Sequence, residues 1–243
     1  MDRIRLYSQD FTEFLEGGLQ KGIISGLYGP AASGKTLTCI LAMLSPDLVG
    51  KKIVYIDTEK GLSTDRIKQI MPDCNEQLNN TIFFNPKNFP EMQKICEKLD
   101  KVINEKFGLI IVDTISSSYR LEIANKSDQK KLNQDFVNIT SHLSKISKDY
   151  DIPILVTTQV YADMNNEDSE SLKLEEKENN NRDKVLPIGG FILKNRCKCF
   201  IELIKLNKNN RMAVIKNHSD IEPGKEMFFK IIGEGIEKFE RPN

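Results

Sequence analysis

Eight consecutive residues match the phosphate-binding pattern G-x-x-x-x-G-K-[ST]. They are Gly29, Pro30, Ala31, Ala32, Ser33, Gly34, Lys35 and Thr36. Glycines let the backbone curl so that successive N–H groups point inward, and the start of a following helix adds partial positive charge. Lys35 would neutralise the outer phosphates, and the Thr36 hydroxyl would ligate Mg²⁺. We therefore predict that this loop binds a nucleoside triphosphate and Mg²⁺, with Lys35 also serving catalysis.

Two acidic residues follow short apolar runs that are typical of buried strands. Asp113 ends the run over residues 109–113, where it could hold the Mg²⁺ shell through water and so join Thr36 as a metal-site residue. Glu59 follows the run over residues 52–57, where a carboxylate could orient or deprotonate the attacking water. Glu59 is thus the candidate general base. Because carboxylates are common at strand ends, the alternative for both is a solvated surface acid.

Gln159 is the third candidate for the reaction itself. It follows the apolar run over residues 153–158, so its amide could lie near the outermost phosphate and respond to nucleotide state. The alternative is an ordinary solvated glutamine in a loop.

Strand-like and helix-like segments alternate around these candidates. Apolar, β-branched runs cover residues 22–28, 52–57, 81–85, 109–113 and 153–158, and helical spacing covers residues 37–44, 89–107 and 128–150. This order predicts an α/β fold with a mostly parallel central sheet flanked by helices. Alternating segments over residues 200–206, 211–216 and 227–232, with a polar turn at 207–210, predict antiparallel strands at the C-terminal end.

Length and composition predict a single domain over residues 1–243, with a short lead-in over residues 1–21. Lys+Arg and Asp+Glu both number 35, so the global charge indicates no partner. No apolar run is long enough to span a membrane, and the charged start lacks a signal peptide, so we expect a cytoplasmic protein without a membrane partner. The scattered cysteines indicate reduced thiols, and Cys197 and Cys199 would point to one face of a strand.

The order of motifs resembles that of RecA-like recombinases over nearly the whole chain. The motifs cover residues 17–22, 29–36, 55–59, 111–114, 119–122, 158–161, 187–190 and 211–213. The core begins almost at once, which leaves no room for the helix-hairpin-helix domain of the main archaeal recombinase RadA; the likeness is therefore to its archaeal paralogues. The resemblance implies a RecA-type ATPase core, single-stranded DNA as a partner, and a role in homologous recombination and DNA repair beside a RadA-like recombinase and other recombination proteins.

By this resemblance, two loops near residues 119–131 and 159–187 would contact DNA. The second loop includes a polar, flexible-looking stretch over about residues 162–186, and residues 163–184 carry eight acids against four bases, which would repel phosphates. Better candidates for DNA contact are Arg120, Lys194, Arg196 and Lys198. The last three begin a basic stretch that continues through Lys205, Lys208, Arg211 and Lys216. Glu202 is the one acidic residue within this stretch. The alternative is that these bases form the solvated face of antiparallel strands.

Two departures from the family pattern bear on ATP hydrolysis. Where related ATPases have a Lys-His-Arg run that reaches a neighbouring subunit's phosphate, this chain has Lys216, Asn217 and His218. Lys216 remains a candidate trans finger, that is, a cation that reaches the phosphate bound by a neighbouring subunit. An arginine in this role raises the rate of phosphoryl transfer about 10³-fold or more, so without it we expect slow hydrolysis. The pair Ala31 and Ala32 replaces a frequent Pro-Gly pair, which strains the loop wherever φ is positive.

Two functions therefore compete. In one, the protein binds ATP as a switch and regulates or assists the main recombinase, with weak ATPase activity. In the other, it is a DNA-dependent ATPase that itself forms filaments and performs strand exchange. The acidic second loop and the weakened finger favour the first.

Overall fold

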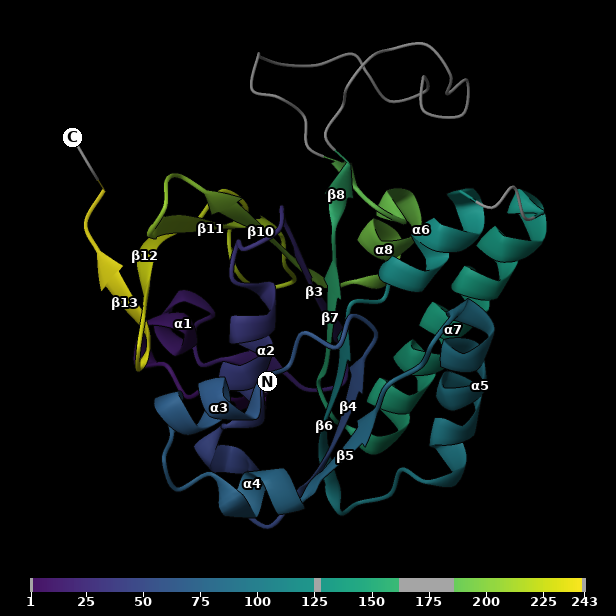
Figure 1. The fold of residues 1–243 in the computed structure, drawn as a ribbon, viewed down its shortest axis with the longest axis horizontal. Helices are drawn as coiled ribbons and strands as arrows, with labels where there is room; N and C mark the ends of the chain where they lie inside the picture. Colours follow the sequence, from purple (N-terminus) through teal and green to yellow (C-terminus); the bar gives the residue numbers. More distant parts are fainter. Residues whose placement is uncertain (1, 125–127, 162–185, 242–243) are drawn as a thin grey trace.

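A nine-stranded sheet forms the centre of the protein (Figure 1). The computed structural model describes residues 2–124, 128–161 and 186–241. The strand order is β13-β12-β11-β10-β3-β7-β6-β4-β5. The strands are β3 (Ile24–Tyr28), β4 (Lys52–Asp57), β5 (Thr81–Phe84), β6 (Phe107–Asp113), β7 (Ile154–Thr158), β10 (Cys199–Lys205), β11 (Asn210–Asn217), β12 (Glu226–Ile232) and β13 (Gly235–Phe239).

The sheet is parallel from β5 to β10 and antiparallel from β10 to β13. Parallel strands covered by helices on both faces read as continuous apolar runs, which is why the sequence located β4, β6 and β7 closely. The predicted fold class is confirmed. Strand β13, at the outer edge of the sheet, was not predicted.

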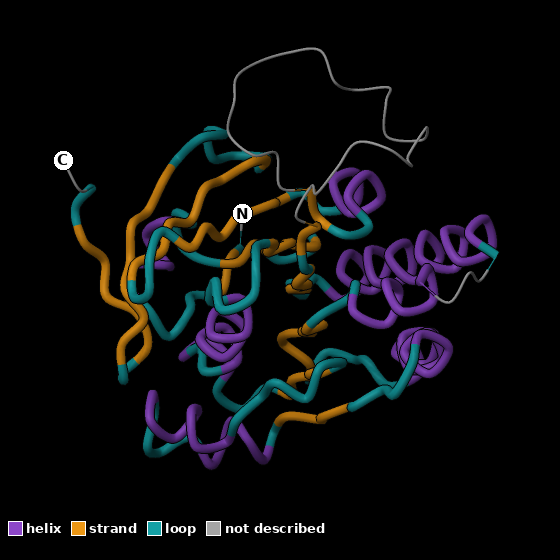
Figure 2. The backbone as a smooth tube through the Cα atoms, turned by 45° about the horizontal axis from the view of Figure 1, so that its top comes forward, coloured by secondary structure: helices purple, strands orange, loops and turns teal. Residues whose placement is uncertain are grey.

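Helices cover both faces of the sheet, as Figures 1 and 2 show from two directions. One layer contains α1 (Gln9–Phe14), α2 (Lys35–Met43), α3 (Thr64–Ile70) and α4 (Asn75–Asn79), and the other contains α5 (Phe89–Lys98), α6 (Ser117–Ala124), α7 (Gln129–Tyr150) and α8 (Gly190–Arg196). Short 3-10 turns cover Pro46–Leu48 and Leu99–Lys101. Two small ribbons pair β1 (Arg3–Ile4) with β2 (Leu19–Gln20), and β8 (Val160–Tyr161) with β9 (Leu186–Pro187).

The two layers enclose two separate hydrophobic cores. Leu109 and Ile111 of β6 pack under the layer of α1–α4, whereas Ile110 and Val112 pack under the layer of α5–α8. Successive side chains of a strand point to opposite faces, so one apolar strand serves both cores. Packing on both faces of the sheet therefore fixes the carboxyl ends of the parallel strands relative to one another.

Helix α7 has the extent that its apolar spacing predicts. The Asp128 carboxylate caps its start by accepting the N–H groups of Lys130 and Lys131. Helix α5 is shorter than predicted: it ends at Lys98, the 3-10 turn Leu99–Lys101 follows, and β6 begins at Phe107. Among the described residues, no helix is long and apolar enough to cross a membrane.

The prediction that Cys197 and Cys199 share one face of a strand is wrong. Cys197 follows the end of α8 and packs in the core under α5–α8, whereas Cys199 begins β10 and packs in the opposite core. All five cysteines are buried and free.

Candidate functional site

The phosphate loop connects β3 to α2 at the carboxyl edge of the sheet. Gly34 precedes α2 with a φ of 106°, in the left-handed region, and no side chain caps this helix. The N–H groups of its first turn therefore remain free of a protein cap and face the loop. Gly29 packs so closely that a Cβ would lie 2.2 Å from the Leu203 carbonyl oxygen, so this position requires glycine. Gly29 and Gly34 of the predicted motif thus both occupy positions that a larger residue would not fill easily.

Ser33 and Ala32 show how tightly the loop is built. The Ser33 hydroxyl is buried and has no hydrogen-bond partner among the described residues. A buried polar atom without a partner in a phosphate loop is consistent with a ligand that supplies one. Ala32 has a φ of 59°, which is unfavourable for alanine. The strain that we expected for a positive φ in this loop is therefore present at Ala32.

Lys35 points back into the loop. Its Nζ donates to the carbonyl oxygens of Gly29 and Pro30, both at 2.8 Å, and the residue is 8% exposed. Burial lowers the pKa of Lys35, whereas the negative charges of Asp113 and Glu59 raise it. The ammonium group thus lies inside the loop, among the groups predicted to act on phosphate.

Asp113 ends β6 and lies buried beside Thr36. The Tyr55 hydroxyl donates to Oδ2 of Asp113 at 3.1 Å, and the Thr157 hydroxyl donates to Oδ1. Burial raises the pKa of Asp113, although its interactions with the hydroxyls of Thr157, Thr36 and Tyr55 act in the opposite direction. The structure therefore brings the two predicted metal-site residues together, and hydroxyl and carboxylate oxygens suit Mg²⁺.

Sequence reasoning missed the support for Asp113. Tyr55 and Asp57 are two residues apart on β4, so they share a face of the sheet, and that spacing was the available signal for Tyr55. Asp57 stabilises the loop that carries Glu59. Its carboxylate accepts the backbone N–H groups of Glu59, Gly61 and Leu62.

Glu59 and Gln159 meet at the same edge of the sheet. Oε1 of Glu59 accepts the Nε2 amide of Gln159 at 2.6 Å and the Thr114 hydroxyl at 3.1 Å. The backbone N–H of Gln159 is fixed by the Ser116 hydroxyl at 3.1 Å. The candidate base and the candidate sensor are therefore in direct contact.

Arg120 extends this contact toward the first predicted DNA loop. Its NH1 group donates to Oε1 of Gln159 at 3.3 Å, so Gln159 joins Arg120 to Glu59. Arg120 is exposed, whereas its neighbour Tyr119 is buried and packs its ring 4.6 Å from that of Phe136. Arg120, rather than Tyr119, is positioned to meet a ligand outside the protein.

The predicted basic stretch does not form one surface. Lys194, Arg196 and Lys198 are exposed, the first two in the last turn of α8, where cations also favour the helix dipole. Arg211, in contrast, is 4% exposed, and Lys216 pairs with Glu202 at 3.2 Å. The interpretation of the whole stretch as one solvated or DNA-facing strip is therefore wrong at Arg211.

His218, at the position matching the family's arginine, is buried. Its Nδ1 accepts the N–H groups of Asp220 at 3.0 Å and Ile221 at 3.2 Å, and its Nε2 lies 3.4 Å from Arg3 NH1. Burial lowers the pKa of His218, and the Arg3 charge lowers it further. This ring holds a turn in place and presents no charge to a neighbour.

Part of each predicted DNA loop lies outside the described residues, namely 125–127 of the first and 162–185 of the second, which includes the acidic stretch.

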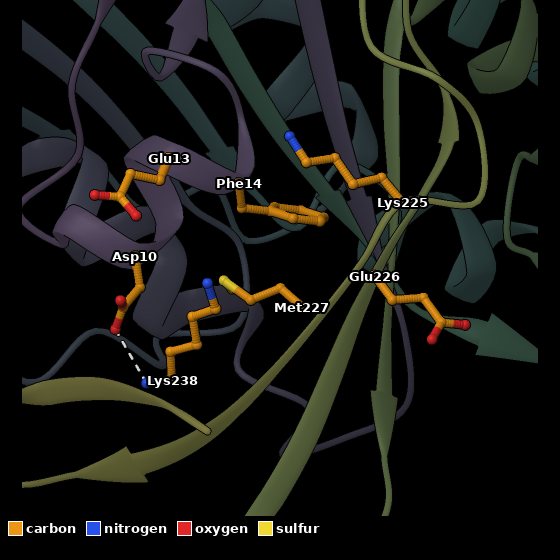
Figure 3. Close-up of a pocket in the computed structure, with 7 residues that line it drawn as sticks. All are labelled: Asp10, Glu13, Phe14, Lys225, Glu226, Met227 and Lys238. Carbon is orange, nitrogen blue, oxygen red and sulfur yellow. Dashed lines mark hydrogen bonds between the residues drawn. The ribbon is translucent and has the colours of Figure 1, made fainter. Parts of the chain in front are cut away.

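A separate cavity of about 100 Å³ lies between α1 and the strands β12 and β13 (Figure 3). Its lining includes Asp10, whose carboxylate accepts the backbone N–H of Lys238 at 3.0 Å. None of the predicted site residues lines this cavity.

The strand order, the phosphate loop between β3 and α2, and the acid-ended strands β4 and β6 define a RecA-type protein. The chain belongs to the Rad51 family, whose model matches residues 2–239.

Relatives that match nearly the whole chain carry the name DNA repair and recombination protein RadB. The chain is 36% identical to RadB of Methanococcus maripaludis over 227 residues, which cover 93% of this chain and 95% of the relative. It is 35% identical to RadB of Methanocaldococcus jannaschii, with 93% and 97% of the two chains covered. A crystal structure of the RadB recombinase matches with a TM-score of 0.75 and 30% identity, over 96% of this chain and 97% of that one. The resemblance to the RecA-like recombinase family is confirmed, and these relatives are RadB proteins.

Proposed function

We propose that this chain is an ATP-binding, DNA-binding recombinase paralogue that acts in homologous recombination and DNA repair by assisting or regulating a RadA-like recombinase. We propose further that residues 1–243 form one RecA-like domain that hydrolyses ATP slowly. The observation that carries the proposal is the contact of Glu59 with Gln159 beside Lys35 and Asp113. This contact supports the proposal because it brings the candidate base and the candidate sensor together near the candidate phosphate-binding cation.

The residues of the loop fit a nucleotide with its metal. The uncapped start of α2, the Lys35 ammonium and the unpartnered Ser33 hydroxyl can all receive phosphate oxygens, and Thr36 with Asp113 can hold Mg²⁺. Bound ATP would supply the phosphoanhydride bond that is cleaved. Lys35 would then exchange its two carbonyl partners for phosphate oxygens.

Glu59 is the general base of this proposal. Its carboxylate is exposed enough to accept a proton from water, and Thr114 and Gln159 fix one of its oxygens. Gln159 connects this base to Arg120, so a change at Glu59 can reach the surface that carries Arg120. We therefore assign Gln159 as the sensor of nucleotide state.

Slow hydrolysis follows from the residues that replace the finger. Lys216 is held by Glu202, and His218 is buried as a turn cap. For Lys216 to serve a neighbouring subunit it would first have to leave that ion pair. Loss of an arginine in trans is worth about 10³-fold or more in rate.

Single-stranded DNA is the ligand that the exposed cations would bind. Lys194, Arg196 and Lys198 lie close together in sequence at the end of α8, and Arg120 lies on α6. Such cations neutralise phosphates without reading sequence. The binding would therefore be sensitive to salt and tolerant of sequence.

Strand exchange with a RadA-like recombinase tests this proposal. The chain is expected to raise the rate or extent of exchange by the main recombinase while giving none alone, and to form no long filaments on single-stranded DNA in electron micrographs. A chain that forms filaments and exchanges strands unaided would be the autonomous recombinase of the alternative. No effect on the main recombinase would contradict the assisting role.

A further inference from the structure

Arg211 ties the phosphate loop to the turn between β10 and β11. Its Nε donates to the Ala32 carbonyl oxygen at 2.9 Å, across 179 residues of sequence. Its NH1 donates to the carbonyl oxygens of Asn207 at 2.8 Å and Asn210 at 3.0 Å. One planar side chain therefore holds two separate loops in a fixed relation.

Within the described residues, the contacts of this guanidinium are to carbonyl oxygens. Arg211 is 4% exposed, and among the described residues no carboxylate forms an ion pair with it. Carbonyl oxygens accept from its Nε and NH1 groups without neutralising the charge, and a buried charge without an ion-pair partner is costly. Burial accordingly lowers the pKa of Arg211, although an arginine stays protonated. A polyphosphate in the adjacent loop would supply the missing negative charge.

The carbonyl that Arg211 binds belongs to the strained residue of the loop. Ala32 has a φ of 59°, a conformation that glycine adopts freely and alanine does not. The hydrogen bond from Nε orients the Ala32 carbonyl and so favours this conformation over the relaxed one. The next residues, Ser33 and Gly34, lead directly into the first turn of α2.

We propose that Arg211 is a positioning residue of the phosphate site, which holds Ala32 in the left-handed conformation and adds a positive charge, without an ion-pair partner among the described residues, that the phosphates of a nucleotide neutralise. This inference deepens the proposed function and rests on it, since it takes the loop to bind ATP. Arg211 contacts no reacting atom and acts through Ala32.

Binding of fluorescent ATP with Mg²⁺ to two substituted chains tests the role. Arg211→Met removes both the charge and the guanidinium N–H donors, and we expect its Kd for ATP to rise about tenfold or more. Arg211→Lys keeps the charge but loses the paired guanidinium donors, so its Kd for ATP should rise less. The matched control is Arg66→Met, because Arg66 also donates to two backbone carbonyls, of Ile232 at 2.6 Å and Gly233 at 2.9 Å, neither of which belongs to the phosphate loop. Its Kd should equal that of the parent.

A second substitution separates positioning from general stability. Ala32→Gly removes the cost of a positive φ, so in the Arg211→Met background it should restore part of the lost affinity. A purely structural role for Arg211 would give no such rescue. Unchanged Kd in Arg211→Met, or no rescue by Ala32→Gly, would overturn the proposal.

Hydrogen exchange without nucleotide provides a readout that does not depend on ATP binding. In Arg211→Met the amides of residues 29–36 should exchange faster, while those of β4 keep the parent rate. Equal rates over residues 29–36, or equal acceleration in β4, would overturn the positioning role. A parent chain that fails to bind ATP would instead contradict the proposed function, and exchange would still decide on Arg211. If Arg211→Met does not fold, Arg211→Lys carries the same comparison.

Discussion

The carboxylate of Glu59 and the side-chain amide of Gln159 lie 2.6 Å apart, although 100 residues separate them in sequence. Glu59 follows β4 and Gln159 follows β7, and parallel strands direct their carboxyl ends to the same edge of a sheet. The contact joins a group suited to proton transfer with a group that can report on it.

Removing the acid at residue 59 tests the assignment of the base. Glu59→Gln should lower single-turnover ATP hydrolysis by about 10²-fold or more while ATP affinity stays close to that of the parent, because general bases contribute on this scale. Glu237→Gln is the control, since Glu237 is exposed on the edge strand β13. Equal hydrolysis by Glu59→Gln and the parent would show that Glu59 is only a surface acid.

Removing the amide at residue 159 tests the link between nucleotide and DNA. In the parent, a non-hydrolysable ATP analogue should change single-stranded DNA affinity about fivefold or more, a typical coupling between sites. Gln159→Ala should abolish the change, since it breaks the hydrogen bonds with both Glu59 and Arg120. Fluorescence anisotropy with labelled DNA measures both affinities. A full nucleotide effect in Gln159→Ala would contradict the sensor role.

Charge removal on α8 tests the DNA surface. Lys194→Ala combined with Arg196→Ala should weaken binding of single-stranded DNA and reduce the slope of log Kd against log salt by about one for each phosphate that is no longer neutralised. Lys52→Ala is the control, because Lys52 is exposed at the amino end of β4, the opposite edge of the sheet. If both changes had the same small effect, α8 would be an ordinary solvated helix.

The buried ring of His218 predicts a pH dependence of stability. Burial and the Arg3 and Lys225 charges lower its pKa, against the opposing effects of Asp220 and Glu16. Below about pH 6.5, His218 binds a proton in the unfolded chain but stays neutral in the folded chain. The free energy of unfolding should therefore fall as pH decreases, by at most about 1.4 kcal/mol per pH unit for this group. The loss should end once pH passes below the lowered folded pKa.

Urea unfolding between pH 7.5 and 5 measures this dependence. His218→Asn is the comparison, because an amide oxygen can accept the same two N–H groups without titrating. The difference between the two curves isolates His218 from other titrating groups. Parallel curves would show that His218 does not control stability in this range.

The parallel part of the fold was accessible to sequence reasoning because its strands are buried on both faces. β4 has the predicted bounds, Lys52–Asp57. The end of α5 was not accessible, since Leu99, Ile103 and Phe107 keep a helical spacing of four residues after the helix has ended. Periodicity alone does not distinguish a helix from a buried turn that leads into a strand.

Some features of the candidate site could likewise be predicted from the sequence, and others could not. The pairs of Thr36 with Asp113 and of Glu59 with Gln159 could be anticipated, because strand ends of a parallel sheet converge. Arg211 and His218 could not, since basic residues on alternating strands usually mark a solvated face. Their burial depends on carbonyl oxygens and turn N–H groups that only the tertiary structure brings to them.

The central claim is that the chain binds ATP tightly and turns it over slowly. The measurement is ATP binding and ATP turnover by the purified protein, with and without single-stranded DNA, beside Lys35→Ala. We predict tight binding that Lys35→Ala abolishes, with little turnover in either condition. Turnover that DNA raises sharply and Lys35→Ala abolishes would contradict this account and identify an active recombinase motor, and an absence of ATP binding by the parent would contradict the nucleotide site itself.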